Sequence, residues 1–433
     1  MQLLTLYPSL PEHSTVRIPG SKSYTNRALI IASLASGESQ LAGASLSNDS
    51  EVLMHALRCL GVDITVRDGN TICVQGGVEK LRPYSGVIDL GPAGTSMRFL
   101  TALCAAIPGA DVVLQGSTRM HERPIRDLVA TLRQAGANID YLGTEGYPPL
   151  RVHSQERLKG DALSIDGSTS SQFISSLALI APLFKNGLSL YLDGEVTSRS
   201  YLDMTFQSIR DFGVSIEHDG YKRITVQAGQ SYLPQRYQIE GDASGASYLW
   251  GIAALTKRSV TVGNINPASA QGDLYFPRLL EQMGCSVDIA SDAITVTGPS
   301  ELRALEATME LMPDTAQTLA VVAACAKGTS VIRGLKTLRV KETDRIEAMH
   351  RELLKVGVRS EVGPDYLVVH GGTPHAAQIA TYEDHRMAMS FAMLGALISG
   401  IVIEEPQVVA KSFPNFWQVI RQLGIQPTYQ GGR

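Results

Sequence analysis

The sequence predicts an α/β protein with two domains, built from six copies of one small α/β unit. A chain of 433 residues is too long for a single typical hydrophobic core, which makes two domains the expected number. A helical pattern that ends at a glycine and continues into two short strands occurs six times. The glycines of this repeat lie 67 to 77 residues apart and are Gly61, Gly136, Gly213, Gly284, Gly357 and Gly424.

Each copy has the same local signals. The apolar positions before the glycine have helical spacing, and glycine is the common residue just after a helix end. The β-branched runs that follow are separated by Asp-Gly, Glu-Gly or similar pairs, which predicts hairpins. One or two such segments occur by chance in any α/β protein, but six at near-constant spacing do not. The period is too long for a solenoid, so each copy is expected to be a small α/β subdomain.

The sixth copy, IRQLGIQPTYQGG, stops before its second strand. Residues 2–7 alternate like a strand, so we expect this N-terminal segment to complete the last copy. One domain is then discontinuous, formed by residues 1–20 and 240–433, and the other runs from 21 to 239. Residues 238–247 (QIEGDASGAS) are the expected crossover.

Composition excludes several classes of protein. Charged residues make up 18% of the chain and the net charge is only −4, which argues against a nucleic-acid or anionic-membrane partner. Five scattered cysteines without a C-x-x-C pair argue against a disulfide framework or a zinc ribbon. No signal peptide and no apolar run of about 18 residues is recognised. We therefore expect a cytoplasmic protein.

Cations recur where helices are expected to begin. The positive end of the helix dipole disfavours Lys and Arg there, unless a bound anion reverses the balance. Each case alone also fits an ordinary capped surface helix or a solvated charge run, and Glu342 with Arg345 also fits a surface ion pair. Their number favours an anion site, for which the six cations are Lys22, Arg123, Lys341, Arg345, Arg386 and Lys411.

Other segments add polar groups or exclude alternatives. Four consecutive hydroxyls at residues 168–171 exceed what one helix cap needs. Gly91 and Gly94 allow close approach of the backbone to a ligand, although GPAG is neither GxGxxG nor a Walker A loop. The nine histidines show no metal-ligand spacing, so no metal is implied. No nucleophile with an activating partner is recognisable.

Eight motifs, in order from Pro19 to Pro414, together resemble the 5-enolpyruvylshikimate-3-phosphate synthases of the enolpyruvyl transferase family. They are PGSKSYTNRA, GPAGTSMR, ERPI, SSQF, PDTAQT, RVKETDR, DHRMAM and AKSFP. The resemblance implies two domains, each of three α/β subdomains around a pseudo-threefold axis (an inside-out barrel), with the active site in the interdomain cleft. It also implies transfer of the enolpyruvyl group of phosphoenolpyruvate to the 5-hydroxyl of shikimate 3-phosphate, without a cofactor, by a monomer.

The same resemblance assigns residue roles. The shikimate 3-phosphate site would consist of Lys22, Ser23, Arg27, Ser170, Ser171, Gln172, Ser198, Tyr201, Asp314, Thr337 and Lys341. The phosphoenolpyruvate site would consist of Lys22, Gly94, Arg123, Gln172, Arg345, Arg386 and Lys411. Asp314 and Glu342 would be the acid/base pair, Lys22 would assist the leaving phosphate, and His385 would have a supporting role. The sequence around Asp314, PDTAQT, also fits a simple helix N-cap without a catalytic role.

Two positions depart from the enterobacterial pattern, which has asparagine where this chain has Pro92 and Thr337. Pro92 is therefore left out of the site.

A related transferase acts on UDP-N-acetylglucosamine, but it carries a reactive cysteine in the loop that reads MHERPIRDL in this chain. A non-catalytic binder of phosphorylated metabolites is the other alternative. Glyphosate inhibits many family members, and Gly94 predicts sensitivity here, although Phe99 stands where many relatives have proline.

Overall fold

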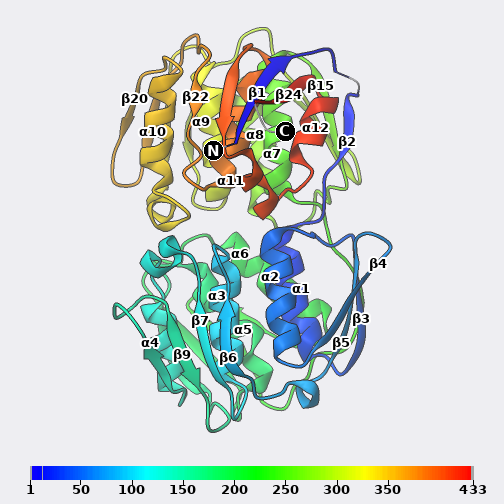
Figure 1. Ribbon diagram of the computed structural model, residues 1–433, viewed down its shortest axis with the longest axis vertical. Coiled ribbons are helices and arrows are strands. Elements are labelled where there is room, and N and C mark those ends of the chain that lie inside the picture. Colours follow the sequence, from blue (N-terminus) through cyan, green and yellow to red (C-terminus); the bar gives the residue numbers. More distant parts are fainter. Residues whose placement is uncertain (1, 12, 431–433) are drawn as a thin grey trace. The chain divides into compact units, whose positions relative to one another are not determined.

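The computed structural model describes residues 2–11 and 13–430. The chain divides into two compact units. One comprises Met1–Pro19 with Glu240–Arg433, and we call it the N/C unit; the other, Gly20–Ile239, is the central unit. In the N/C unit, strand β1 (Leu3–Pro8) pairs antiparallel with strand β24 (Ile425–Gln430), as Figure 1 shows. This pairing confirms that the N-terminal segment completes the sixth repeat.

Six four-stranded sheets share one topology. An outer strand runs parallel to the second, and the third and fourth strands are each antiparallel to their neighbours. The central unit holds the orders β14-β3-β5-β4, β6-β7-β9-β8 and β10-β11-β13-β12. The bounds are β3 (Gly37–Ala42), β4 (Asp63–Arg67), β5 (Thr71–Gly76), β6 (Ser85–Asp89), β7 (Asp111–Gln115), β8 (Ile139–Tyr141), β9 (Leu150–His153), β10 (Asp161–Asp166), β11 (Leu188–Asp193), β12 (Glu217–Asp219), β13 (Arg223–Val226) and β14 (Arg236–Gln238).

The N/C unit repeats this arrangement in the orders β2-β15-β17-β16, β18-β19-β21-β20 and β22-β23-β1-β24. Its other strands are β2 (Thr15–Arg17), β15 (Ser259–Gly263), β16 (Ser286–Ile289), β17 (Ala293–Thr297), β18 (Glu306–Thr308), β19 (Thr329–Arg333), β20 (Ser360–Val362), β21 (Leu367–His370), β22 (Gln378–Ile379) and β23 (Ile401–Glu404). Three repeats therefore build each unit.

Each repeat contains one buried helix and one amphipathic helix. The buried helices are α1 (Lys22–Leu34), α3 (Gly94–Ala105), α5 (Ser171–Leu179), α7 (Ala243–Thr256), α9 (Ala316–Ala324) and α11 (His385–Ala392). All residues of α9 and α11 are buried; α9 is apolar on nearly every side, whereas α11 also buries the polar residues His385, Arg386 and Ser390. The amphipathic helices are α2 (Asn48–Cys59), α4 (Arg126–Gln134), α6 (Ser200–Asp211), α8 (Phe276–Gln282), α10 (Arg345–Lys355) and α12 (Phe416–Gln422).

Each amphipathic helix ends two residues before the glycine that marked the repeat. All six glycines have a positive φ, between 82° and 104°. The amide of each donates to the carbonyl three residues earlier, at 2.9–3.1 Å; Gly61 and Arg58 are one such pair. Glycine has no Cβ to oppose this conformation, which explains why one residue type recurs at this point.

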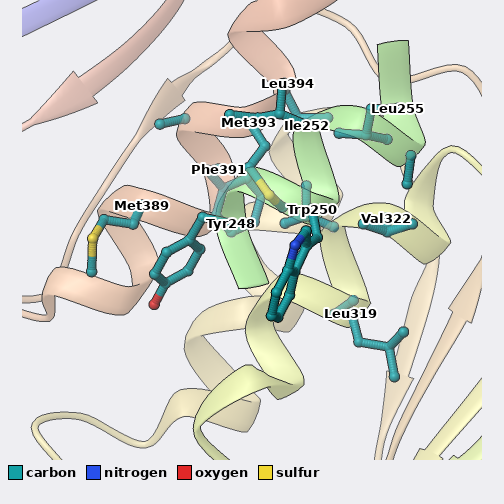
Figure 2. Packing of buried hydrophobic residues seen from close by; sticks show 14 of the residues in the cluster. Tyr248, Trp250, Ile252, Leu255, Leu319, Val322, Met389, Phe391, Met393 and Leu394 are labelled. Atoms are coloured by element: carbon teal, nitrogen blue, oxygen red, sulfur yellow. The ribbon is translucent and has the colours of Figure 1, made fainter. Parts of the chain in front are cut away.

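The core of the N/C unit forms where its three buried helices meet. Figure 2 shows Trp250 and Ile252 of α7 close to Leu319 and Val322 of α9 and to side chains of α11 and the turn after it. The indole of Trp250 is fully buried and donates to the carbonyl of Ile294 at 3.2 Å. Two of these helices begin beside predicted site residues, because Asp314 lies two residues before α9, and His385 and Arg386 open α11.

Candidate active site

The six predicted cations occupy two kinds of position, and only half of them begin helices. Lys22 and Arg345 are the first residues of α1 and α10, and Arg386 is the second residue of α11. The other three close short 3₁₀ turns, each of which follows the second strand of a sheet: Arg123 follows η2 (Thr118–Glu122), Lys341 follows η6 (Lys336–Val340), and Lys411 ends η8 (Pro406–Lys411). The repeated topology therefore puts these three at equivalent places.

Short 3₁₀ turns precede α4, α10 and α12. Pro124 precedes α4 by two residues and does not open it, and α12 likewise begins after Pro414. Lys341 and Arg345 do not share a helical face, because α10 begins at Arg345. Arg123 and Lys341 are extended residues just after their 3₁₀ turns, whereas Ser412, which follows η8, is not extended.

In the central unit, Lys22 has a carboxylate partner. Ser21 caps α1 by accepting from the amide of Tyr24 at 3.4 Å, which sets Lys22 in the first turn. Nζ of Lys22 lies 2.9 Å from Oδ2 of Asp49, and both side chains are largely buried. Asp49 was not among the predicted residues; it lies in the first turn of α2, a common place for an acidic residue with no other role.

Arg27 is buried and held at fixed orientation by neutral oxygen atoms. Its Nε donates to Oγ1 of Thr205 at 2.7 Å, and Nη1 and Nη2 donate at 3.0 Å to the carbonyls of Ser23 and Tyr201. Burial lowers the pKa of Arg27 to about 10, so the group stays charged at neutral pH. None of these partners is a carboxylate, which leaves the positive charge available to an anion.

Gly94, Arg123 and Gln172 come together at the start of α3. A methyl group on Gly94 would lie 2.4 Å from Nη1 of Arg123. Nε2 of Gln172 donates to Oγ1 of Thr95 at 3.3 Å. Arg98 stabilises the backbone on both sides of this site, because its guanidinium donates to the carbonyls of Gly94 and Pro124 at 3.1 and 2.9 Å. The guanidinium of Arg123 and the side-chain amide of Gln172 therefore lie beside the backbone of Gly94, which has no side chain to cover it.

The predicted hydroxyls of the central unit lie at two further helix starts. Ser170 caps α5 by accepting from the amide of Gln172 at 3.3 Å, and Ser171 is the first residue of that helix. Ser198 and Tyr201 flank the start of α6. Ser198 has φ of 53°, which is unusual for a residue with a side chain and points to a functional constraint at this position.

In the N/C unit, Arg345 joins three carboxylates. Its side chain is 2% exposed, and its Nε and Nη2 donate to the carboxylate of Asp384 at 2.7 and 3.3 Å. Nη1 donates to Oδ1 of Asp314 at 3.1 Å, and Nη2 also donates to Oε2 of Glu342 at 2.9 Å. The pair of Glu342 with Arg345 is thus a buried contact, not a surface ion pair.

Both predicted acid/base residues also contact a second cation. Nη2 of Arg386 lies 2.7 Å from Oδ2 of Asp314, and Nζ of Lys411 lies 2.5 Å from Oε1 of Glu342. Asp314 lies inside the 3₁₀ turn η5 (Pro313–Thr315), and Thr315 is the residue at the N-cap of α9. The simple N-cap reading of Asp314 is therefore wrong.

The charges around Asp314 determine its protonation. Burial alone raises the pKa of this carboxyl group, but Arg386, Lys341 and Arg345 outweigh burial and hold the pKa well below its usual range. Asp314 is therefore ionised at neutral pH. It is a weak base as long as these cations face it, and it gains basicity when other anions share their charge.

The segment before α11 is strained and positions two site residues. Tyr382 and Glu383 both have φ of 55°, an unusual conformation for residues with side chains. Asp384 follows, accepts from the amide of Arg386 at 2.9 Å, and is fully buried against Arg345. His385 is 1% exposed, with Nδ1 3.4 Å from Oδ1 of Asp384. Asp384 is therefore both the cap of α11 and a counter-ion of Arg345.

Thr337 lies in η6 and Lys341 directly follows it, and both residues are partly buried. Pro92 is exposed in the loop before α3.

Of the described residues, no group of three or more His, Cys, Asp or Glu side chains could hold a metal ion. In the same part of the chain, none of the helices is long and apolar enough to cross a membrane.

Asp273, in η4 (Gly272–Tyr275), is a carboxyl group that sequence reasoning missed. It is 5% exposed, and Oγ of Ser244 donates to its Oδ2 at 2.8 Å. Burial, together with the negative charge of Asp314, raises the pKa of Asp273 from 3.8 to about 7. The short motif QGD carried no recognisable chemical signal in the sequence.

Replacing Asp273 with asparagine is expected to stabilise the protein at alkaline pH. The folded state keeps this proton up to about pH 7, while the unfolded chain releases it near pH 3.8. The stability that the group contributes is therefore complete below about pH 3.8, falls by about 1.4 kcal/mol for each pH unit between pH 3.8 and 7, and is fully lost above about pH 7. Asp273→Asn removes this loss. Urea midpoints measured from pH 5 to 8.5 should diverge in favour of the variant, and a difference independent of pH would contradict the prediction. Asp288→Asn, at an exposed site in β16, controls for the lost charge.

Comparison with known proteins gives one consistent result. The family model described as EPSP synthase (3-phosphoshikimate 1-carboxyvinyltransferase) matches residues 8–420. A 3-phosphoshikimate 1-carboxyvinyltransferase of Sulfurovum sp. (strain NBC37-1) is 41% identical, over 98% of this chain and 99% of the relative. One of Burkholderia lata is 43% identical, over 96% and 98%. The solved structure of EPSP synthase from Acinetobacter baumannii aligns with a TM-score of 0.83 and 26% identity over the whole of both chains.

Proposed function

The chain belongs to the EPSP synthase family, and from this premise we propose how its residues carry out the family's reaction. The reaction transfers the enolpyruvyl group of phosphoenolpyruvate to the 5-hydroxyl of shikimate 3-phosphate and releases phosphate, in the shikimate pathway to aromatic amino acids. Both substrates are small phosphorylated anions. This matches the buried and partly buried cations that recur in both units.

One observation supports catalysis over binding alone: Asp314 and Glu342 both contact the guanidinium of Arg345. A protein that only binds phosphorylated metabolites gains nothing from carboxylates beside its cations, because they repel the ligand. An addition–elimination reaction needs one group to give a proton and another to take one. Two carboxylates on the same guanidinium supply such a pair within a small region.

We assign the proton transfers as follows. Glu342 protonates C3 of phosphoenolpyruvate, which makes C2 electrophilic. Asp314 takes the proton of the 5-hydroxyl of shikimate 3-phosphate as its oxygen attacks C2, and a tetrahedral ketal forms. Phosphate then leaves with a proton or charge compensation from Lys22, and the carboxylate of Glu342 takes a proton back from C3, which restores the double bond. When the substrate anions share the charge of Arg345 and Arg386, the pKa of Asp314 rises toward that of a useful base.

The remaining residues bind the substrates. Arg345, Arg386, Lys411, Arg123, Gly94 and Gln172 serve phosphoenolpyruvate; arginine suits this task because its planar fork meets a carboxylate or phosphate with two bonds. Arg27, with its charge uncompensated by carboxylates, serves shikimate 3-phosphate together with Ser23, Ser170, Ser171, Ser198, Tyr201, Thr337 and Lys341. His385 supports Asp384 and the start of α11.

The reaction is tested with purified protein, phosphoenolpyruvate and one of two acceptors, by following phosphate release. We expect release with shikimate 3-phosphate and none with UDP-N-acetylglucosamine. No release with shikimate 3-phosphate would overturn the assignment, and binding without turnover would favour the non-catalytic alternative.

Inhibition by glyphosate, measured against phosphoenolpyruvate concentration, tests the sensitivity expected from Gly94.

Gly94→Ala is expected to raise KM for phosphoenolpyruvate about tenfold, with little change in KM for shikimate 3-phosphate. The added methyl group would overlap the guanidinium of Arg123, which is the mobile end of a side chain and must move away. The fold should survive, so the melting temperature should stay within a few degrees of the parent. Gly143→Ala is the matched control, because a methyl group there meets only Pro149 at an ordinary 3.5 Å. An unchanged KM in Gly94→Ala would remove Arg123 from the phosphoenolpyruvate site.

We also propose that both units act on the same pair of substrates, in the interdomain cleft expected from the sequence. Two highly charged reactants must meet away from water, and closure of a cleft would achieve this. Small-angle scattering that is unchanged by saturating amounts of both substrates would contradict closure.

We further propose a cytoplasmic monomer. All five cysteines are free thiols, which suits a reducing compartment. Sedimentation equilibrium tests the oligomeric state.

A further inference from the structure

Tyr248 is a buried polar residue that none of the predicted roles includes. It lies on α7, where 13 of 14 residues are buried, and its own exposed fraction is 1%. Figure 2 shows its ring at the edge of the hydrophobic core, with the hydroxyl pointing away from Ile252 and Met393. A phenylalanine would fill this position equally well if packing were the only requirement.

The hydroxyl of Tyr248 contacts a proposed substrate-binding cation. Nη1 of Arg386 donates to the Tyr248 hydroxyl at 3.2 Å, while Nη2 of the same guanidinium lies 2.7 Å from Oδ2 of Asp314. Two different partners thus hold the two terminal nitrogens. A planar guanidinium held at both nitrogens cannot rotate without breaking one of these bonds.

The ring of Tyr248 is itself held by the segment that carries a second cation. It meets the ring of Phe416 edge to face, with centroids 5.9 Å apart, and Phe416 meets Phe413 at 5.5 Å. Both phenylalanines closely follow Lys411, which ends η8. Tyr248 therefore connects the start of α11, through Arg386, with the Lys411 segment.

We propose that Tyr248 is a positioning residue for phosphoenolpyruvate, which its hydroxyl serves by holding the guanidinium of Arg386 in the orientation that receives the substrate anion. This inference rests on the proposed role of Arg386. Tyr248 does not touch the reacting atoms; it acts through Arg386.

The chemistry of a phenol suits this task. A carboxylate in the place of the hydroxyl would hold the guanidinium equally well but would add a second negative charge beside that of Asp314. Burial raises the pKa of Tyr248 to about 12, against the opposing effect of Arg386, so the hydroxyl stays neutral at any physiological pH. A neutral acceptor fixes the geometry of the cation without adding a further negative charge that would oppose the substrate anion.

The test is Tyr248→Phe, which removes one oxygen and keeps the ring. We expect KM for phosphoenolpyruvate to rise about tenfold, with KM for shikimate 3-phosphate unchanged and kcat lowered less than threefold. A purely structural hydroxyl would lower the melting temperature without this separation. Tyr232→Phe is the matched control: Tyr232 is also buried, its hydroxyl donates to the carbonyl of Leu179 at 3.0 Å, and that bond lies in the central unit. The control should lose some stability and keep both KM values.

A double-mutant cycle with Arg386→Gln separates failure of the inference from failure of the proposed site. If Tyr248 acts through Arg386, Tyr248→Phe should have little further effect on KM in the Arg386→Gln background. If Arg386→Gln alone leaves KM for phosphoenolpyruvate unchanged, the proposed site is wrong. If Arg386→Gln raises KM but Tyr248→Phe does not, or if the two effects multiply fully, the positioning role is wrong and the site stands. Should Tyr248→Phe turn over too slowly, the increase in melting temperature with added phosphoenolpyruvate gives the same comparison.

Discussion

Glu342→Gln is expected to lower kcat by about three orders of magnitude and to leave binding of shikimate 3-phosphate nearly unchanged. Glutamine cannot give a proton to C3 of phosphoenolpyruvate, and a positioned general acid contributes about 10²–10⁴ to the rate. The amide oxygen can still accept from Arg345 or from Lys411, which now bond the two carboxylate oxygens at 2.9 and 2.5 Å. The local structure should therefore persist.

The measurement is single-turnover kinetics, with calorimetry for shikimate 3-phosphate binding. Glu347→Gln is the matched control, because it makes the same chemical change on helix α10, where Glu347 pairs only at the surface with Arg351. Its kcat should equal that of the parent. Loss of shikimate 3-phosphate binding in Glu342→Gln would make Glu342 a structural residue, and a kcat near that of the parent would exclude it as the acid.

Arg345→Met is expected to destabilise the N/C unit by about 3–5 kcal/mol, which is typical when one partner of a buried ion pair is removed. Asp384, whose side chain is fully buried, would lose both of its bonds to the guanidinium. Asp314 and Glu342 would each lose one bond as well. Methionine fills much of the same volume, so the loss should come from uncompensated charge more than from a cavity. Binding of phosphoenolpyruvate should fall with it.

Tryptophan fluorescence in urea is the appropriate measurement, because both tryptophans of the chain, Trp250 and Trp417, belong to the N/C unit. Arg351→Met is the control on the same helix: Arg351 pairs with Glu347 at 3.0 Å, but its side chain is 60% exposed. An exposed pair of this kind contributes only about 0.3–0.5 kcal/mol. Equal destabilisation by the two substitutions would show that Arg345 does not compensate buried charge.

Much of the fold could be predicted from the sequence because its signals are local. The six glycines marked the ends of the amphipathic helices, and the alternating N-terminal segment indicated the strand that completes the sixth repeat. The four hydroxyls at residues 168–171 indicated a capped helix start, and Ser170 is the cap there. The 3₁₀ turns before α4, α10 and α12 were not, because their residues fit a longer helix equally well until tertiary packing fixes where each helix begins.

The sequence by itself determined the repeat, the family, the list of cations and the two carboxylates Asp314 and Glu342. Only the tertiary structure decided which of them meet. Arg345 gathers carboxylates from positions 314, 342 and 384, and Tyr248 reaches Arg386 across 138 residues of sequence. Asp49, Asp273 and Tyr248 have no local signal, because an acid near a helix start or a tyrosine in an apolar helix has many ordinary explanations. Their chemistry comes from burial beside charge, a long-range property that arises when distant segments pack together.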